Sequence, residues 1–421
     1  MHIVIVADHA YINGGQSKVA IESGLGLAAR GHRVTYFAAV GPVDPRLPAA
    51  GIETICLGQD DIDTATSKLA FLKQIIWNGT AEKRLGDVLA GLDPADTVVH
   101  VHAWPKALSP SIGAALQRAG LPCVYTMHEF FMVCPNGGFY DYQRAVTCHR
   151  DPMSLACLTT NCDAINYPRK LVRVARQVVL DRSGLRDVFG HIIMISALQY
   201  EVSRKYMPDA PVYHRVDNPI DAPDLGPKLK PGDQFLYAGR LSREKGIEHF
   251  CAAATLAGIQ PVIAGDGPLM AELKQKYPQA RFLGWQKPDA MREHMRAARA
   301  LVFPSVWYEG QPLTVYEALA MGTPVIVSDV CAGREAVEDG VNGLWFKSGD
   351  AASLAAAMQR LTADDVAVRM TSAAYEGYWA RPLSLDRHLD GIEAVYRQAI
   401  AGHMALELAS AFRGNASAKD V

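Results

Sequence analysis

Short runs of apolar residues alternate along most of this chain with longer segments whose apolar positions recur at helical spacing. Each apolar run has the length of one buried strand, and each longer segment has the length of one helix. Repeated strand–helix–strand order is typical of α/β proteins built on parallel sheets. The runs that we expect to be strands are His2–Ala7, Val34–Ala38, Thr97–His102, Cys123–Met127, His191–Ser196, Phe235–Gly239, Gln260–Ala264, Ala300–Phe303, Val325–Ser328 and Gly343–Phe346.

One proline-rich stretch interrupts this alternation near the middle of the chain. Residues 218–232 contain four prolines. Proline at this density is typical of a linker. Because strands and helices alternate again beyond it, we predict two doubly wound domains, residues 1–217 and residues 233–374.

Composition narrows the class of protein. The chain has 421 residues, of which 49% are hydrophobic and 20% charged, an ordinary balance for a globular protein of two domains. The net charge of −2 gives no reason to expect a nucleic-acid partner. No apolar run reaches the roughly 18 residues that span a bilayer. The start lacks a basic region and meets Asp8 too early for a signal peptide. We therefore expect a cytoplasmic protein, in contact at most with the inner face of a membrane.

The most informative stretch is residues 303–326. A strand stops at Pro304, a polar loop follows, and a helix runs over about Leu313–Met321. Glu309 lies in the loop and Glu317 in the helix, with seven residues between them. Loops at the carboxyl ends of parallel strands bind ligands in open α/β sheets, and free N–H groups at a helix start suit an anion. Two carboxylates beside that point can hold sugar hydroxyls, although solvated surface charges are the alternative.

A second informative stretch, G-R-L-S-R-E-K-G, covers residues 239–246 and follows a predicted strand. It places Arg240 and Lys245 five residues apart. When a sugar–diphosphate bond breaks, the leaving diphosphate gains negative charge, and fixed cations stabilise that charge. A pair of surface cations with no ligand is the alternative.

These two stretches resemble the E-x7-E and G-R-x-x-x-x-K-G regions of the family 4 retaining glycosyltransferases, also called glycosyl transferases group 1. The resemblance is strong from Phe235 to about Leu361 and weaker in the first domain. It implies the GT-B fold, an α/β architecture in which two Rossmann-like domains face each other across a cleft. It further implies that the donor binds to the second domain and the acceptor to the first. A helix at about residues 383–402 is expected to cross back to the first domain, followed by a tail, 403–421, that is disordered from Arg413.

The resemblance also assigns roles to individual residues. Arg240 and Lys245 would hold the diphosphate, Glu309 would contact the transferred sugar, and Glu317 would bind the ribose hydroxyls. His128, at the end of a predicted strand, matches the active-site histidine of the family, whereas we expect His100 to be packed and hydrogen-bonded. The remaining residues implied to bind the donor are Gly14, Gly15, Gly239, Gly265, Asp266, Gly267, Gly284, Gly310, Gln311, Pro312, Leu313 and Thr314. For the glycines at 14 and 15, a plain tight turn is the alternative.

We therefore expect a retaining glycosyltransferase that moves a sugar from a nucleotide-diphosphate sugar to a glycan or a lipid-linked acceptor in polysaccharide biosynthesis. A UDP-sugar is favoured over a GDP-sugar on family frequency alone. No cofactor and no catalytic metal are expected, because the one acidic run, Asp60–Asp63, lies far along the chain from the donor motifs. A sugar-nucleotide epimerase of the same fold and a non-catalytic nucleotide-sugar sensor are the alternatives.

A cysteine-rich insertion occupies residues 134–162 of the first domain. Its four thiols, in a reducing compartment, suggest one structural Zn²⁺. Packed free thiols are an equal alternative, because the spacing is not the paired C-x2-C form. The four residues are Cys134, Cys148, Cys157 and Cys162.

A basic segment follows the insertion. Residues 168–182 predict a helix with cations at helical spacing beside apolar positions, which suggests contact with anionic lipid or with an acceptor diphosphate. A solvated face is the favoured alternative. The cations are Arg169, Lys170, Arg173 and Arg176.

Overall fold

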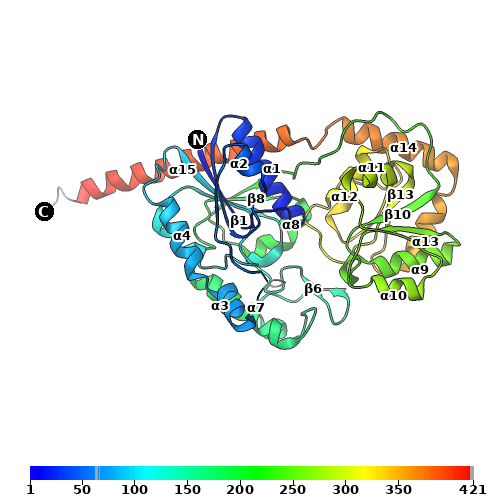
Figure 1. Cartoon of the computed structure of the whole chain (residues 1–421), viewed down its shortest axis with the longest axis horizontal. Helices are drawn as coiled ribbons and strands as arrows, with labels where there is room; N and C mark the ends of the chain where they lie inside the picture. Colours follow the sequence, from blue (N-terminus) through cyan, green and yellow to red (C-terminus); the bar gives the residue numbers. More distant parts are fainter. Residues whose placement is uncertain (62–64, 66, 418–421) are drawn as a thin grey trace.

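The structure is a computed structural model that describes residues 1–61, 65 and 67–417. It has two parallel β-sheets, each covered by helices, and the sheets belong to consecutive halves of the chain (Figure 1). The predicted α/β architecture of two Rossmann-like domains is confirmed. No helix in the described part of the chain is long and apolar enough to cross a bilayer.

The N-terminal sheet has seven strands in the order β3-β2-β1-β4-β5-β8-β9. Every residue of β1 is buried, because helices cover both faces of the sheet and leave no solvated face. The strands are β1 (His2–His9), β2 (Arg33–Val40), β3 (Glu53–Cys56), β4 (Thr97–Val101), β5 (Cys123–Met127), β8 (His191–Met194) and β9 (Val212–Arg215). The helices around it are α1 (Gly15–Ala29), α2 (Arg46–Ala49), α3 (Lys68–Ile76), α4 (Gly79–Leu89), α5 (Ile112–Ala119), α7 (Tyr167–Arg182), α8 (Ala197–Ser203) and the 3₁₀ turn η2 (Arg204–Tyr206).

The cysteine-rich insertion lies between β5 and α7 and forms small elements of its own. These are a 3₁₀ turn, η1 (Phe130–Met132), a two-stranded hairpin of β6 (Tyr140–Asp141) and β7 (Val146–Thr147), and the short helix α6 (Leu155–Thr159). In Figure 1 the hairpin lies at the edge of the N-terminal domain that faces the C-terminal domain.

The C-terminal sheet has six strands in the order β12-β11-β10-β13-β14-β15. They are β10 (Gln234–Ala238), β11 (Pro261–Ala264), β12 (Arg281–Gly284), β13 (Ala298–Phe303), β14 (Val325–Ser328) and β15 (Gly343–Phe346). The helices are η3 (Arg243–Lys245), α9 (Ile247–Ala257), α10 (Met270–Lys276), α11 (Pro288–Ala297), α12 (Leu313–Ala320), η4 (Ala332–Glu335), α13 (Ala351–Arg360) and α14 (Asp364–Trp379). Strand order reverses beside β1 in one sheet and beside β10 in the other, and ligands bind at such points.

The last helix, α15 (Leu385–Ser417), returns from the C-terminal domain and runs along the N-terminal domain (Figure 1). It is anchored by hydrogen bonds between His388 Nε2 and Ser23 Oγ (3.0 Å) and between Tyr396 OH and His100 Nδ1 (2.6 Å). Residues 413–417 belong to this helix, and the disorder expected from Arg413 stays a prediction. Residues 418–421 lie outside the described residues, as do Ile62 and Asp63 of the acidic run.

Candidate active site

Glu309 lies in the loop after β13, and one of its carboxylate oxygens accepts three hydrogen bonds. Oε1 accepts from Lys245 Nζ (2.7 Å), Ser305 Oγ (2.8 Å) and Trp307 Nε1 (2.7 Å). Burial acts to raise the pKa of the Glu309 carboxyl, but the Lys245 ammonium and the three hydrogen bonds outweigh it and lower that pKa below its ordinary value. Glu309 is therefore an ionised, oriented carboxylate at neutral pH.

A close approach of two loops brings Lys245 to this carboxylate. Gly246 has φ +67°, and a Cβ atom there would lie 1.9 Å from the carbonyl oxygen of Pro304. The loop after β13 is tied to the same turn, because the N–H of Val306 donates to Glu244 O (3.0 Å). Only glycine allows the turn that carries Lys245 to pack against the end of β13.

Arg240 leaves the end of β10 and lines the same cleft as Lys245. The loop that carries it is held by backbone hydrogen bonds to the loop after β11, from Leu241 N to Asp266 O (2.9 Å). Gly265 makes this contact sterically feasible, because a Cβ atom there would lie 1.9 Å from Gly239 O. The two cations therefore project from a rigid pair of loops.

Helix α12 begins beside these cations. Its N-cap residue, Pro312, provides no side-chain cap, so the first N–H groups of the helix are available to an anion. Glu317 lies one turn further along, and burial raises the pKa of its carboxyl, with Lys18 and Asp221 among the charges nearby. The helix thus presents N–H donors and a half-buried carboxylate to the cleft.

The histidine predicted from the sequence faces this site from the other domain. His128 Nε2 lies 3.1 Å from His102 Nδ1, and His128 lines the cleft. Burial lowers the pKa of His128 to about 3, so its imidazole is neutral at physiological pH. His100 bonds to Thr126 Oγ1 (2.7 Å) and Tyr396, as expected for a packed histidine.

Most of the predicted site residues line one cleft of about 590 Å³ between the two domains. Those that line it are Gly14, Gly15, His128, Gly239, Arg240, Lys245, Glu309, Gly310, Gln311, Pro312, Leu313, Thr314 and Glu317. An adjoining hollow of about 380 Å³ is lined by Gly265 and Asp266 and shares Arg240 and Glu317 with the cleft. Gly267 and Gly284 line neither; the Gly284 carbonyl instead accepts the N–H of Gly265 (2.7 Å).

Two protein-family models match the chain. The model described as "Glycosyl transferase 4-like domain" matches residues 14–214, and "Glycosyl transferases group 1" matches residues 232–364. Alpha-maltose-1-phosphate synthase of Mycolicibacterium smegmatis is 30% identical over 310 residues, which are 64% of this chain and 70% of that protein. The chain belongs to the family 4 glycosyltransferases. The family predicted from the sequence is confirmed, and the protein is an enzyme of the transferase type.

Solved structures share the fold of this glycosyltransferase. Sucrose-phosphate synthase of Thermosynechococcus elongatus superposes with a TM-score of 0.68 at 22% identity, covering 95% of this chain and 99% of that one. Anabaena HepE in complex with UDP-glucose superposes with a TM-score of 0.64 at 17% identity, covering 96% and 99%. These likenesses confirm the predicted GT-B fold.

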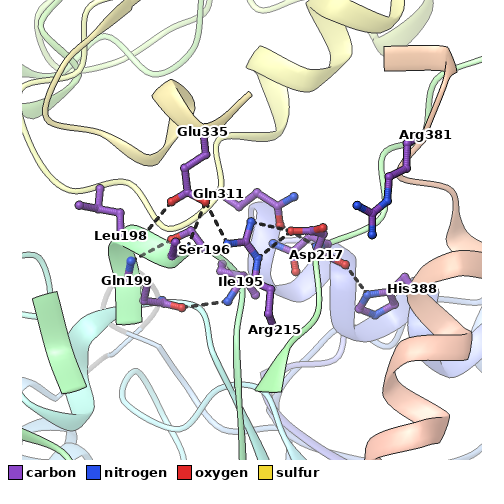
Figure 2. A network of polar contacts seen from close by, with 12 residues as sticks. Ile195, Ser196, Leu198, Gln199, Arg215, Asp217, Gln311, Glu335, Arg381 and His388 are labelled. Carbon is purple, nitrogen blue, oxygen red and sulfur yellow. Dashed lines mark hydrogen bonds and ion pairs between the residues drawn. The ribbon is translucent and has the colours of Figure 1, made fainter. Parts of the chain in front are cut away.

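The two domains of the glycosyltransferase are also joined outside the cleft, as Figure 2 shows. The Glu335 carboxylate, from η4 of the C-terminal domain, accepts the N–H groups of Ala197 (3.1 Å) and Leu198 (2.8 Å) at the start of α8 in the N-terminal domain. It also pairs with Arg215 at the end of β9 (2.9 Å). One acidic side chain therefore caps a helix of the opposite domain.

The cleft is connected to the linker through Gln311. Its side-chain oxygen accepts the N–H of Asn218 (2.6 Å), so Gln311 contacts the linker while it lines the cleft. The neighbouring Asp217 carbonyl lies 2.8 Å from His388 Nδ1 of α15 (Figure 2). Hydrogen bonds thus connect the loop of Glu309, the linker and α15 to one another.

The thiols of the cysteine insertion pack around a lysine in this glycosyltransferase. No group of three or more histidine, cysteine, aspartate or glutamate side chains in the described ranges is arranged to hold a metal ion, and all eight cysteines are free. A lysine lies where a metal would be needed: Lys170 Nζ is 3.1 Å from Cys162 Sγ and 3.5 Å from Cys157 Sγ. This arrangement agrees with packed free thiols at positions 134, 148, 157 and 162, and the four-thiolate zinc site stays a prediction.

Three of the four cations of the basic helix α7 contact groups of the N-terminal domain, and contact of this helix with lipid stays a prediction. Lys170 is fully buried and Arg176 nearly so. Arg176 donates to the carbonyl of Pro105 (2.7 Å), and Arg173 pairs with the buried carboxylate of Asp163 (3.1 Å). Arg169, the fourth predicted cation, is half-buried and forms no ion pair in the described part of the chain. These cations therefore hold the insertion to the domain.

Sequence reasoning missed several residues that line the cleft. Lys18 of α1 lies beside Glu317, and Trp307 hydrogen-bonds Glu309. Trp285, in contrast, was expected from the sequence together with Gly284; it borders the adjoining hollow and is 70% exposed. Lys18 carried no local signal, because its role depends on how the two domains face each other.

Proposed function

We infer that this protein is a retaining glycosyltransferase that transfers a sugar from a nucleotide-diphosphate sugar to a glycan or a lipid-linked acceptor. The observation that carries this proposal is the grouping of Arg240, Lys245 and the start of α12 around a cleft that also holds an ionised Glu309. Two cations and free helix N–H groups at one point suit a diphosphate, and a carboxylate beside them suits sugar hydroxyls.

The leaving diphosphate is stabilised by fixed charge. As the bond between the sugar and the diphosphate lengthens, negative charge develops on the diphosphate oxygens. Arg240, Lys245 and the first N–H groups of α12 are already placed at that position, so little reorganisation is needed when the charge appears. No divalent metal is required for this step.

The carboxylates and the histidine bind the two ends of the donor. Glu317, in the part of the cleft shared with the hollow near Gly265, binds the ribose hydroxyls. Glu309 contacts the transferred sugar through Oε2, since the hydrogen bonds from protein groups go to Oε1. His128, neutral at physiological pH, contributes a hydrogen bond from the N-terminal domain and no charge.

The favoured donor is a UDP-sugar. This part of the proposal is supported by the structural likeness to Anabaena HepE, which was solved in complex with UDP-glucose. Relatives also include the UDP-Gal:alpha-D-GlcNAc-diphosphoundecaprenol alpha-1,3-galactosyltransferase of Escherichia coli, 27% identical over 43% of this chain and 53% of that protein. Its name supports a lipid-linked acceptor.

A panel of UDP-, GDP- and ADP-sugars tests the proposal. We expect nucleotide diphosphate release from a UDP-sugar, first as slow hydrolysis and faster when an acceptor is present. NMR of the transferred sugar should show the anomeric configuration of the donor. Interconversion of the donor sugar without nucleotide release would indicate an epimerase, and binding without turnover would indicate a sensor; either result would reject a transferase.

A further inference from the structure

Trp307 is one of the three hydrogen-bond donors to Glu309, and it lies outside both the E-x7-E and the G-R-x-x-x-x-K-G motifs. Its indole N–H donates to Oε1 at 2.7 Å. The Trp307 ring also lies beside Lys245, a second hydrogen-bond donor to Glu309, with Lys245 Nζ 5.3 Å from the ring centroid. Trp307 therefore contacts both members of the Lys245–Glu309 pair.

The cysteine insertion of the opposite domain holds this ring in place. Gly138 lies against it so closely that a Cβ atom there would be 2.7 Å from Trp307 Cζ3. The ring of Tyr140, in β6, lies 6.4 Å from the Trp307 ring, centroid to centroid. Thr147 Oγ1, in β7, donates to the carbonyl of Val306 (3.1 Å). The hairpin thus binds both the ring and the backbone that precedes it.

The direction of the three hydrogen bonds matters for the chemistry. Within the described residues, Lys245, Ser305 and Trp307 all donate to Oε1, and no described group donates to Oε2. A carboxylate fixed through one oxygen presents the other in a defined direction. Without the indole N–H, the carboxylate keeps its charge and its lysine but loses one of the bonds that fix its rotation.

We propose that Trp307 is a positioning residue for Glu309, and that the insertion, residues 134–162, serves sugar transfer by holding Trp307 from across the domain boundary. This inference rests on the proposed function of Glu309 as the residue that contacts the transferred sugar. It gives the insertion a role in the reaction.

The kinetic test is Trp307→Phe, which keeps an aromatic ring against Gly138 and removes the N–H. We expect kcat to fall by about 10-fold or more, because a hydrogen bond to a charged group is lost, while UDP affinity and the KM for the UDP-sugar stay near wild type. The matched control is Trp345→Phe, since Trp345 also donates its N–H, to Val337 O (2.7 Å), but outside the cleft. Wild-type kcat in Trp307→Phe, or an equal loss of UDP affinity, would overturn the proposal.

The insertion is tested by Gly138→Ala, whose methyl group must displace the Trp307 ring. We expect a fall in kcat of the same kind, with UDP affinity retained. Gly377→Ala is the control, because a Cβ atom at Gly377 meets nothing within 4 Å. Unchanged kcat in Gly138→Ala would show that the insertion does not act through Trp307.

A spectroscopic test does not depend on turnover and separates this inference from the proposed function. The chain has six tryptophans, so ¹⁵N-Trp labelling gives six indole N–H signals, and Trp307→Phe identifies the one of interest. We expect that signal to shift when Glu309→Gln removes the carboxylate. An unshifted signal would refute the Trp307–Glu309 bond, even if the enzyme is active; a shifted signal with no turnover on any donor would count against the proposed function alone.

Discussion

Lys245 and Arg243 are two residues apart in the same 3₁₀ turn, yet only Lys245 lines the cleft. Lys245 contacts Glu309, whereas Arg243 is exposed and lies outside the lining of the cleft. We therefore expect Lys245→Ala to lower turnover by ~10²–10³, the usual cost of losing one group that stabilises developing charge. Arg243→Ala removes the same type of charge nearby and should change turnover little. Equal losses in the two variants would show that only the general positive potential matters.

Substitution of Glu309 is expected to affect sugar transfer, whereas substitution of Glu317 is expected to affect UDP binding. Glu309→Gln keeps the size of the side chain and removes its charge, so transfer should fall strongly while UDP binding is nearly unchanged. Glu317→Gln should instead weaken UDP binding, because the ribose contact is lost. Calorimetric UDP titration and a transfer assay measure both. Weakened UDP binding in Glu309→Gln would place Glu309 at the nucleotide and not at the sugar.

The predicted site residues that line the cleft are mostly those with a local signal in the sequence. Lys245 and Gly246 belong to one short motif, and Gly246 is needed for a backbone conformation that the motif itself implies. Lys170 and Trp307 had no such signal. The thiol partners of Lys170 are 8 and 13 residues away in an irregular insertion, and Gly138, which packs on the Trp307 ring, is in the opposite domain. The surroundings of both side chains therefore depend on tertiary packing.

At the scale of elements, β4, β5 and α15 bring together four buried histidines. Burial lowers the pKa of His128 to about 3 and of His388 to about 4, and lowers those of His100 and His102 well below 6.5. The folded protein keeps them neutral, so below pH 6.5 only the unfolded chain takes up these protons. The contribution of these histidines to the free energy of unfolding is therefore complete above pH 6.5. As the pH drops below 6.5, the free energy of unfolding falls by ~1.4 kcal/mol per pH unit for each histidine.

Urea unfolding at pH 7.5 and pH 5.5 measures this effect. His102→Asn should reduce the pH dependence, because one titrating group is removed from the core. His149→Gln should leave it unchanged, since His149 is exposed. Equal stability at the two pH values would contradict the neutral, buried state of the cluster.

The order and the approximate bounds of most strands and helices could be predicted from the pattern of apolar residues. β13 extends two residues further back than predicted, to Ala298, and the alternation of strands and helices is as expected because buried parallel strands are short and continuously apolar. The insertion could not be derived in this way. Its hairpin and α6 are too short to show periodicity, and their place is fixed by contacts with Trp307 and Lys170.

At the scale of the whole molecule, Glu335 joins the domains by capping α8 and pairing with Arg215. Glu335→Ala should favour a more open arrangement, because it removes charge-assisted bonds across the boundary. We expect a larger radius of gyration in X-ray scattering and a higher KM for the donor, with kcat less affected. Glu338→Ala, three residues away in the same domain, is the control. An unchanged radius of gyration and KM would show that the contact does not hold the domains together.

The central claim is that protein groups, and not a divalent metal, stabilise the departing diphosphate. The most direct measurement is nucleotide diphosphate release from the UDP-sugar with and without EDTA, followed by addition of Mg²⁺. Because Arg240, Lys245 and the start of α12 surround the cleft, we predict the same rate in all three conditions. Loss of activity with EDTA and recovery with Mg²⁺ would contradict this account.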